Sequence, residues 1–117
     1  MQRYYDELSN ETRGEFQIIV DKTWEDIPLD HLFDDSVTDI ADLARRIDAG
    51  LLDYFQLRVR VFLDQIELSS DSCGGFVYED ARETLTDGTA EDMIQCAIES
   101  ARQEARRLQQ RFAGLTV

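Results

Sequence analysis

Residues Tyr54 to Leu63, YFQLRVRVFL, carry the clearest structural pattern in this sequence. Apolar residues stand at every second position from Phe55 onward, and polar or charged residues fill most of the positions between them. This alternation is typical of a strand that packs one face against a core. We expect residues 64–65 to form a two-residue turn, so that the chain returns from Ile66 as the second strand of a hairpin.

The register of this hairpin follows from the length of its turn. A two-residue turn pairs Leu68 with Val61 and brings Asp71 opposite Arg58, while Arg60 lies diagonal to Asp71 or Glu67. The sequence therefore predicts ion pairs across the hairpin, between its two strands.

The remaining elements follow from hydrophobic periodicity and from helix start and stop signals. In chain order they are a short helix over residues 2–12, a strand over 15–22, a turn of helix within the acidic connector 24–35, a helix over 36–49, the hairpin with its second strand completed by 76–78 after a glycine bulge at 73–75, a helical turn over 79–85, and a long helix over 89–113. We predict an α+β fold, a single domain over residues 1–117. Its three-stranded, mainly antiparallel sheet is covered by helices and followed by a long C-terminal helix.

The helix ends rest on capping signals. Ser36, with Asp39 three residues later, resembles a capping box, and Gly50 supplies the stop. Thr89 is expected to cap the long helix. The stripe expected to be buried on that helix comprises Ile94, Ala97, Ile98, Ala101, Ala105, Leu108 and Phe112, with Cys96 beside it on the same apolar face.

The chain is strongly acidic, and the acids are unevenly distributed. Its formal net charge is −13. Residues 21–53 hold ten acids against three bases, and residues 64–99 hold ten against one, whereas residues 54–63 carry +2 and residues 100–117 carry +3. A surface this negative repels nucleic acid and anionic membranes and speeds encounters with basic partners. We therefore expect no direct binding of nucleic acid and no membrane association.

The acids of the connector and first long helix are the candidate binding site. Apolar residues such as Trp24 are interleaved with them, as an interface with charged rim and apolar centre requires. The predicted partner-binding residues are Asp21, Trp24, Glu25, Asp26, Asp30, Asp34, Asp35, Asp39 and Asp42. The alternative is that these acids form a solvated face that keeps the protein soluble.

Catalytic and metal-binding patterns are weak in this chain. A cysteine nucleophile needs a histidine base, and His31 is the only histidine. Since Cys96 is expected on a buried face, the only candidate pair is Cys73 with His31. A zinc site needs about four Cys or His ligands, and the chain has three such residues, scattered. We expect two free thiols, no cofactor, no metal and no enzymatic activity. A cysteine-dependent enzyme at Cys73 is the third functional class left open.

Two segments resemble small uncharacterised proteins of phages and mobile elements. They are residues 66–78, IELSSDSCGGFVY, and the pair of motifs at 87–88 and 91–94, DG and EDMI. In size, acidity and α+β composition the chain also resembles phage anti-CRISPR and anti-restriction inhibitors, several of which imitate DNA. The resemblance is one of type and carries over no functional residue.

The resemblance implies an inhibitor that occupies the basic nucleic-acid channel of a host defence complex, such as a CRISPR effector, in place of DNA. The alternative is a structural or assembly adaptor that binds a protein partner through its hairpin or its long helix. The first residues contain no apolar signal segment, and a cytoplasmic location is expected.

Overall fold

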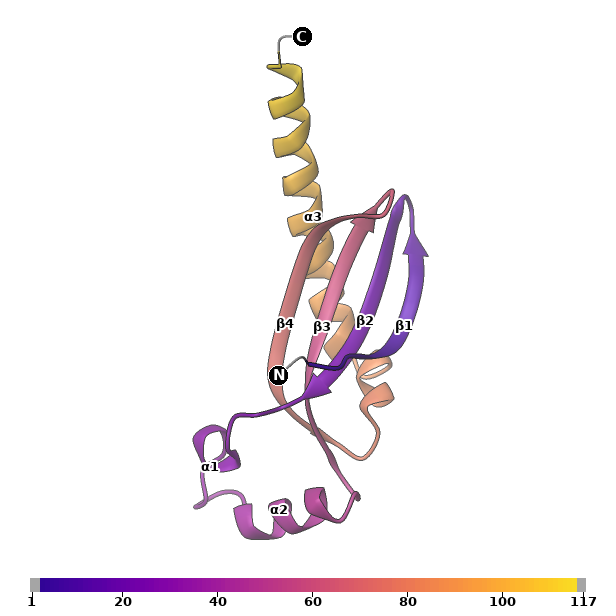
Figure 1. Ribbon diagram of the computed structural model, residues 1–117. Helices are drawn as coiled ribbons and strands as arrows, with labels where there is room; N and C mark the ends of the chain where they lie inside the picture. Colours follow the sequence, from indigo (N-terminus) through magenta and orange to yellow (C-terminus); the bar gives the residue numbers. More distant parts are fainter. Residues whose placement is uncertain (1–2, 116–117) are drawn as a thin grey trace.

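The computed structural model describes residues 3–115. Its elements are β1 (Asp6–Arg13), β2 (Phe16–Trp24), α1 (Leu29–Leu32), α2 (Ile40–Asp48), β3 (Asp53–Leu63), β4 (Ile66–Tyr78), the 3-10 helix η1 (Ala81–Leu85) and α3 (Thr89–Ala113). The strands form one antiparallel sheet in the order β1-β2-β3-β4, with α3 against one of its faces (Figure 1). The predicted α+β fold with an antiparallel sheet and a long C-terminal helix is confirmed.

The sheet has four strands instead of the predicted three, because the segment expected to form a helix over residues 2–12 contains β1. Residue 2 lies outside the described residues. Gly14, at φ +61°, opens a two-residue turn that pairs Arg13 with Phe16. Without β1 the backbone groups of β2 would lack partners along one edge. This pairing outweighs a helix preference that is weak in a segment with Asp6 and Asn10.

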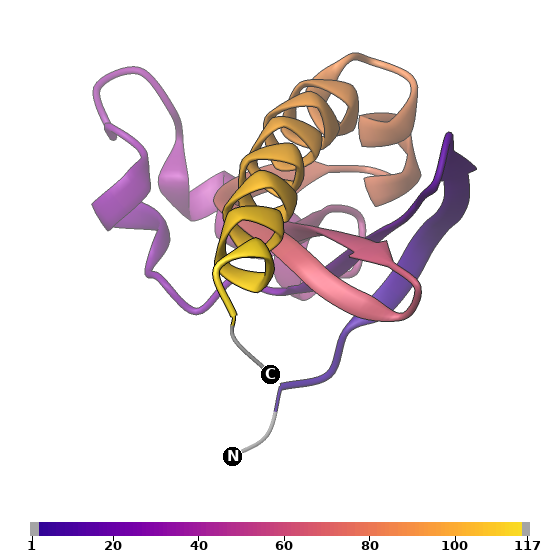
Figure 2. The same cartoon turned by 90° about the horizontal axis from the view of Figure 1, so that it is seen from above.

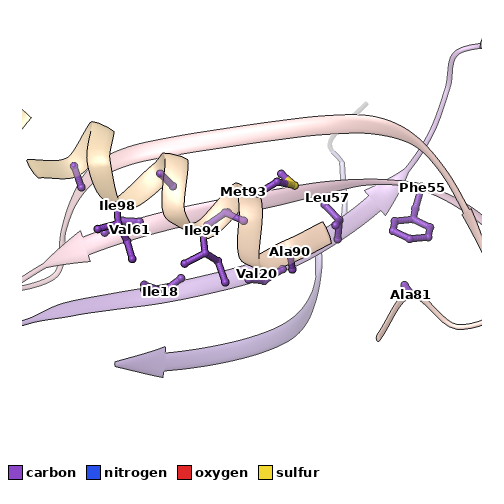
Figure 3. Packing of buried hydrophobic residues seen from close by; sticks show 13 residues of the cluster. Ile18, Val20, Phe55, Leu57, Val61, Ala81, Ala90, Met93, Ile94 and Ile98 are labelled. Carbon is purple, nitrogen blue, oxygen red and sulfur yellow. The ribbon is translucent and has the colours of Figure 1, made fainter. Parts of the chain in front are cut away.

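The core lies between α3 and the inner faces of β2 and β3 (Figure 3). The predicted strands over 15–22 and 54–63 are confirmed, and their alternating apolar residues point at the helix. The buried hydrophobic residues are Ile18, Val20, Phe55, Leu57, Val59 and Val61 of the sheet, Ala81 of η1, and Ala90, Met93, Ile94, Ala97, Ile98 and Ala101 of α3. The opposite face of the sheet is not covered by α3 and carries polar and charged residues.

The predicted hairpin turn at residues 64–65 is confirmed. Asp64 and Gln65 have φ values of +49° and +69°, the pattern of a type I′ turn, whose twist matches that of the strands it joins. The predicted register is wrong from Leu68 onward, because Leu68 is an extra residue in a bulge. Arg58 consequently lies opposite Ser72, not Asp71.

A second bulge occurs at Gly74 and Gly75, and the strand resumes at Phe76, as predicted. Gly75 has a φ of +81°, a conformation that favours glycine. The expected helical turn over 79–85 is also confirmed as η1.

Two helices begin at different caps from those predicted. The N-cap of α2 is Asp39, whose side chain accepts a hydrogen bond from the backbone of Asp42 at 3.0 Å. Ser36 instead donates to Asp34, which closes a local turn before the helix. The N-cap of α3 is Gly88, one residue before the predicted cap Thr89.

Not all of the stripe predicted to be buried on α3 is covered. Its first four members are buried, but Ala105 and Leu108 are only partly covered and Phe112 is 62% exposed. Cys96, expected on the buried side, is exposed, because its position on the helix turns it away from the sheet.

The start of α3 is tied to the edge strand by an ion pair. Arg13 donates to both carboxylate oxygens of Glu91, Nη1 at 2.7 Å and Nη2 at 2.8 Å. The Arg13 guanidinium, followed by the Gln95 amide, lowers the pKa of Glu91 to about 2. This contact fixes β1 against the helix face.

Replacing Glu91 with glutamine is expected to lower stability at neutral pH but not in strong acid. In the folded chain the Glu91 pKa is lowered from 4.5 to about 2, so the carboxylate stabilises the fold above about pH 4.5 and loses that effect as the pH falls toward 2. The difference in unfolding free energy between wild type and Glu91→Gln, measured by urea titration, should shrink over this range. Asp92→Asn, in the same helical turn but outside the ion pair, is the control. An equal pH dependence in both variants would contradict this assignment.

The molecule is elongated, with principal extents of 62 × 28 × 25 Å. The segment containing α1 and α2 projects from one end of the sheet, and the last turns of α3 extend beyond the other end (Figure 1). Seen from above, the segment that contains α1 lies to one side of α3 (Figure 2). The two ends therefore present separate surfaces.

Candidate functional site

The acidic lobe, residues 25–53, joins the end of β2 to the start of β3 and contains α1 and α2. It carries nine acids against Arg45 and Arg46, a net charge of −7. Neither helix buries a residue, and Val37 is 85% exposed. Ile27, Leu32 and Leu51 are also exposed. The lobe is thus an acidic projection with apolar side chains at its surface.

The neck of the lobe, where the chain leaves β2 and enters β3, is held to the sheet by Glu25. One carboxylate oxygen, Oε1, accepts hydrogen bonds from Gln56 Nε2 at 3.0 Å and from the backbone amides of Asp26 and Ile27. The other, Oε2, accepts from the backbone amide of Gly75 at 2.8 Å. Burial raises the pKa of Glu25, but these donors outweigh burial and lower it overall. Glu25 therefore acts as a clasp between the lobe and β4.

Two further contacts close the neck. Tyr54 Oη donates to the carbonyl oxygen of Ile27 at 2.6 Å, and Lys22 forms an ion pair with Asp53. The base of the lobe is consequently fixed, although α1 and α2 have no buried core of their own.

Two of the nine predicted binding residues are buried. Asp21 is only 3% exposed and lies on the sheet face opposite α3, where it accepts hydrogen bonds from Arg58 and Arg60. Glu25 is the buried clasp described above. Both carboxylates are occupied by internal contacts, so neither contributes to an exposed acidic surface.

The other seven are exposed or partly exposed, but several have local roles. Trp24 packs against the guanidinium of Arg3, which also pairs with Asp26. Asp34 accepts from Ser36, which lowers the Asp34 pKa.

Three of the remaining acids lie on or beside α2, and one lies in α1. Asp39 caps α2, and Asp42 pairs with Arg45 at 3.2 Å. Asp30 and Asp35 are exposed. Asp48, at the end of α2, is also an exposed acid of the lobe and was not among the predicted residues.

A second candidate surface lies at the opposite end of the molecule and was also missed. It is an apolar groove of about 600 Å³ between the β3–β4 hairpin and the last turns of α3. Its apolar walls are Leu63, Ile66, Leu68, Ala105, Leu108 and Phe112. The α3 residues of this groove were predicted to be buried, because the periodicity of a helix does not reveal where its neighbouring sheet ends.

The features that bear on catalysis or metal binding are limited. Cys73 is exposed beside a hollow of about 330 Å³ lined also by Glu25 and Gly74. Within residues 3–115, no hydrogen bond joins His31 to this thiol. In the same range, no three His, Cys, Asp or Glu side chains gather closely enough to hold a metal ion. None of the described helices is both long and apolar enough to cross a membrane.

Comparisons of the chain with protein-family models, with curated protein sequences and with solved structures found no match.

Proposed function

We propose that this chain is a non-catalytic binding protein whose acidic lobe occupies a basic surface of a partner macromolecule, in the position that nucleic acid would take. The observation that carries the proposal is the lobe itself, with its charge of −7 and its two helices that bury no residue. Helices that neither stabilise a core nor cover the sheet are surfaces available to a partner.

The chemistry of the lobe matches that of a charge-steered interface. Carboxylates such as Asp30, Asp35 and Asp48 attract a surface rich in Lys and Arg and orient it during encounter. The exposed apolar residues Ile27 and Leu32 supply contacts that exclude water once the partner is bound. The resemblance to phage inhibitors points to a partner in a host defence complex, such as a CRISPR effector, whose nucleic-acid channel is basic.

Reversing three lobe charges is expected to abolish capture of the partner. Asp30→Lys, Asp35→Lys and Asp48→Lys together change the lobe from −7 to −1, since each reversal adds two charges. These three residues are chosen because none of them is the cap of α2 or the clasp. Binding is measured by pull-down from host lysate at low and at high salt, with identification of the captured proteins. Wild-type capture should weaken steeply with salt, because screening shortens the reach of exposed charges to about 10 Å at 0.1 M.

The matched control changes the net charge by the same amount elsewhere. Glu15→Lys, Glu79→Lys and Glu83→Lys are three exposed acids outside the lobe. This variant should retain most of the capture. Full capture by the lobe variant, equal losses in both variants, or no wild-type capture at low salt would each contradict the proposal.

The second candidate function is an adaptor that binds a protein partner through the hairpin and the long helix. The apolar groove at those two elements favours it. Binding of this kind should be insensitive to salt and to the lobe reversals, and it should be lost in Phe112→Glu. The same pull-down therefore separates the two candidates.

A further inference from the structure

We infer that the apolar groove is the interface of a two-fold dimer, in which the last turns of α3 from a second copy of this chain fill the groove of the first. The inference concerns the end of the molecule opposite the acidic lobe. It does not depend on the proposed function, and the two fail in different experiments.

One wall of the groove is the uncovered end of the α3 stripe. Ala101 is completely buried under the sheet, and the same side of the helix continues through Ala105 and Leu108 to Phe112. The helix extends past the hairpin tip, where the sheet no longer covers it (Figure 1). About three turns of helix thus present an apolar face without a partner within the described chain.

The other wall is the hairpin. Leu63 and Ile66 are paired across it and point to the same side as the core, and Leu68 joins them at the groove because of its bulge. Ile66 is 62% exposed. A contiguous apolar patch that spans two elements marks an interaction surface more often than scattered apolar residues do.

The groove is lined mainly by apolar side chains, so an amphipathic helix can cover it, and α3 ends in such a segment. Ala105, Leu108 and Phe112 therefore serve both as one wall of the groove and as the face that would enter the groove of another copy. A surface that is complementary to itself is the condition for a two-fold interface, which closes after two copies.

The charges at the rim point to the same occupant. Residues 64–71 of the hairpin carry three acids and no base, of which Asp64 lines the groove and Glu67 lies on the opposite face of the sheet, whereas residues 102–111 of α3 carry four arginines and Glu104, a charge of +3. Arg102 and Arg111 form no ion pair within the described chain. A two-fold axis through the groove places the basic helix end of each copy beside the acidic hairpin of the other.

The expected solution mass is twice the 13.5 kDa of the single chain, measured by light scattering after size-exclusion chromatography over a wide range of concentration. Ile66→Glu and Phe112→Glu should each raise the dimer dissociation constant by about thirtyfold or more, the effect of losing one central contact. Because both side chains are exposed in the single chain, circular dichroism should remain that of the wild type. Val37→Glu, an exposed apolar residue of the lobe, is the matched control and should leave the dimer intact.

A charge exchange tests the geometry. Asp64→Lys with Asp71→Lys changes the hairpin from −3 to +1, and Arg102→Glu with Arg111→Glu changes the helix end from +3 to −1. Each double variant alone should be a weaker dimer than the wild type, because its hairpin and helix end then carry like charges. Their mixture should form a heterodimer, in which both contacts are attractive again.

Several results would overturn the inference. A wild-type chain that stays monomeric at high concentration would do so, as would a mass that keeps growing with concentration, which indicates open head-to-tail assembly. A dimer that survives both Ile66→Glu and Phe112→Glu places the interface elsewhere. Binding of a lipid or a foreign helix by a monomeric wild-type chain identifies a different occupant. None of these results alters the pull-down outcome expected for the lobe.

Discussion

Replacing Asp21 with alanine is expected to lower the free energy of unfolding by about 3 kcal/mol or more, the cost of leaving a buried ionic group without its partner. The Asp21 carboxylate accepts from Arg58 Nε at 2.9 Å and Nη2 at 2.7 Å, and from Arg60 Nη2 at 3.3 Å. The ring of Tyr5 covers the Arg58 guanidinium, with its centroid 3.5 Å from Cζ. Without Asp21, two partly buried guanidinium groups remain side by side and lose the carboxylate that accepts their hydrogen bonds.

Urea denaturation of two further variants separates this effect from a general loss of surface charge. Glu15→Ala removes an exposed acid of the β1–β2 turn and should change stability by less than about 0.5 kcal/mol. The triple variant Asp21→Leu, Arg58→Met, Arg60→Met removes the whole network and should recover most of the stability lost in Asp21→Ala. If Asp21→Ala is as stable as Glu15→Ala, the network does not hold the sheet together.

Replacing Gly74 with alanine is expected to cost about 3 kcal/mol, because the added methyl group has no room. A Cβ at this position would lie 2.2 Å from Oε2 of Glu25 and 3.2 Å from Cγ of Gln56. The carboxylate would have to move, and it would lose the hydrogen bond from Gly75 that joins the lobe to β4. The neck of the lobe should loosen while the core between α3 and the sheet persists.

A double-mutant cycle tests this explanation. Once Glu25→Ala has removed the carboxylate, Gly74→Ala should add little further cost, so the two effects should be strongly non-additive. Gly114→Ala is the control, since a Cβ there meets only ordinary contacts at 3.7 Å. Additive costs for Gly74→Ala and Glu25→Ala would show that the clash lies elsewhere. Hydrogen exchange in residues 25–53 should rise in Gly74→Ala if the clasp is the contact that was lost.

The correct sequence predictions were those that depend on neighbours along the chain. The alternation from Phe55 to Val61 fixes the inner face of β3 whatever the strand pairs with. The turn at residues 64–65 was predicted correctly from the length of the connection alone. The distribution of charge into an acidic lobe and a basic helix end is likewise a property of the chain.

The wrong predictions concerned pairings between distant segments. The segment over residues 2–12 was predicted to be a helix, but it contains β1, because this segment pairs with the free edge of β2. No local sequence pattern indicates that such an edge is available. The bulge at Leu68 shifts β4 by one residue, which exchanges the two faces of the strand. That shift places Asp71 opposite Val59 and not opposite Arg58, whose ion pair with Asp21 follows from the register between β2 and β3.

For the candidate sites too, some features were predictable from the sequence and others were found only in the structure. Residues 21–53 were predicted from the sequence to be acidic and interleaved with apolar side chains. The burial of Asp21 and Glu25 and the exposure of the α3 stripe after Ala101 follow from the tertiary structure. The physical reason is that burial depends on which segments meet in space. Charge and periodicity are properties of a single segment, whereas the burial of a side chain requires a second segment that packs against it.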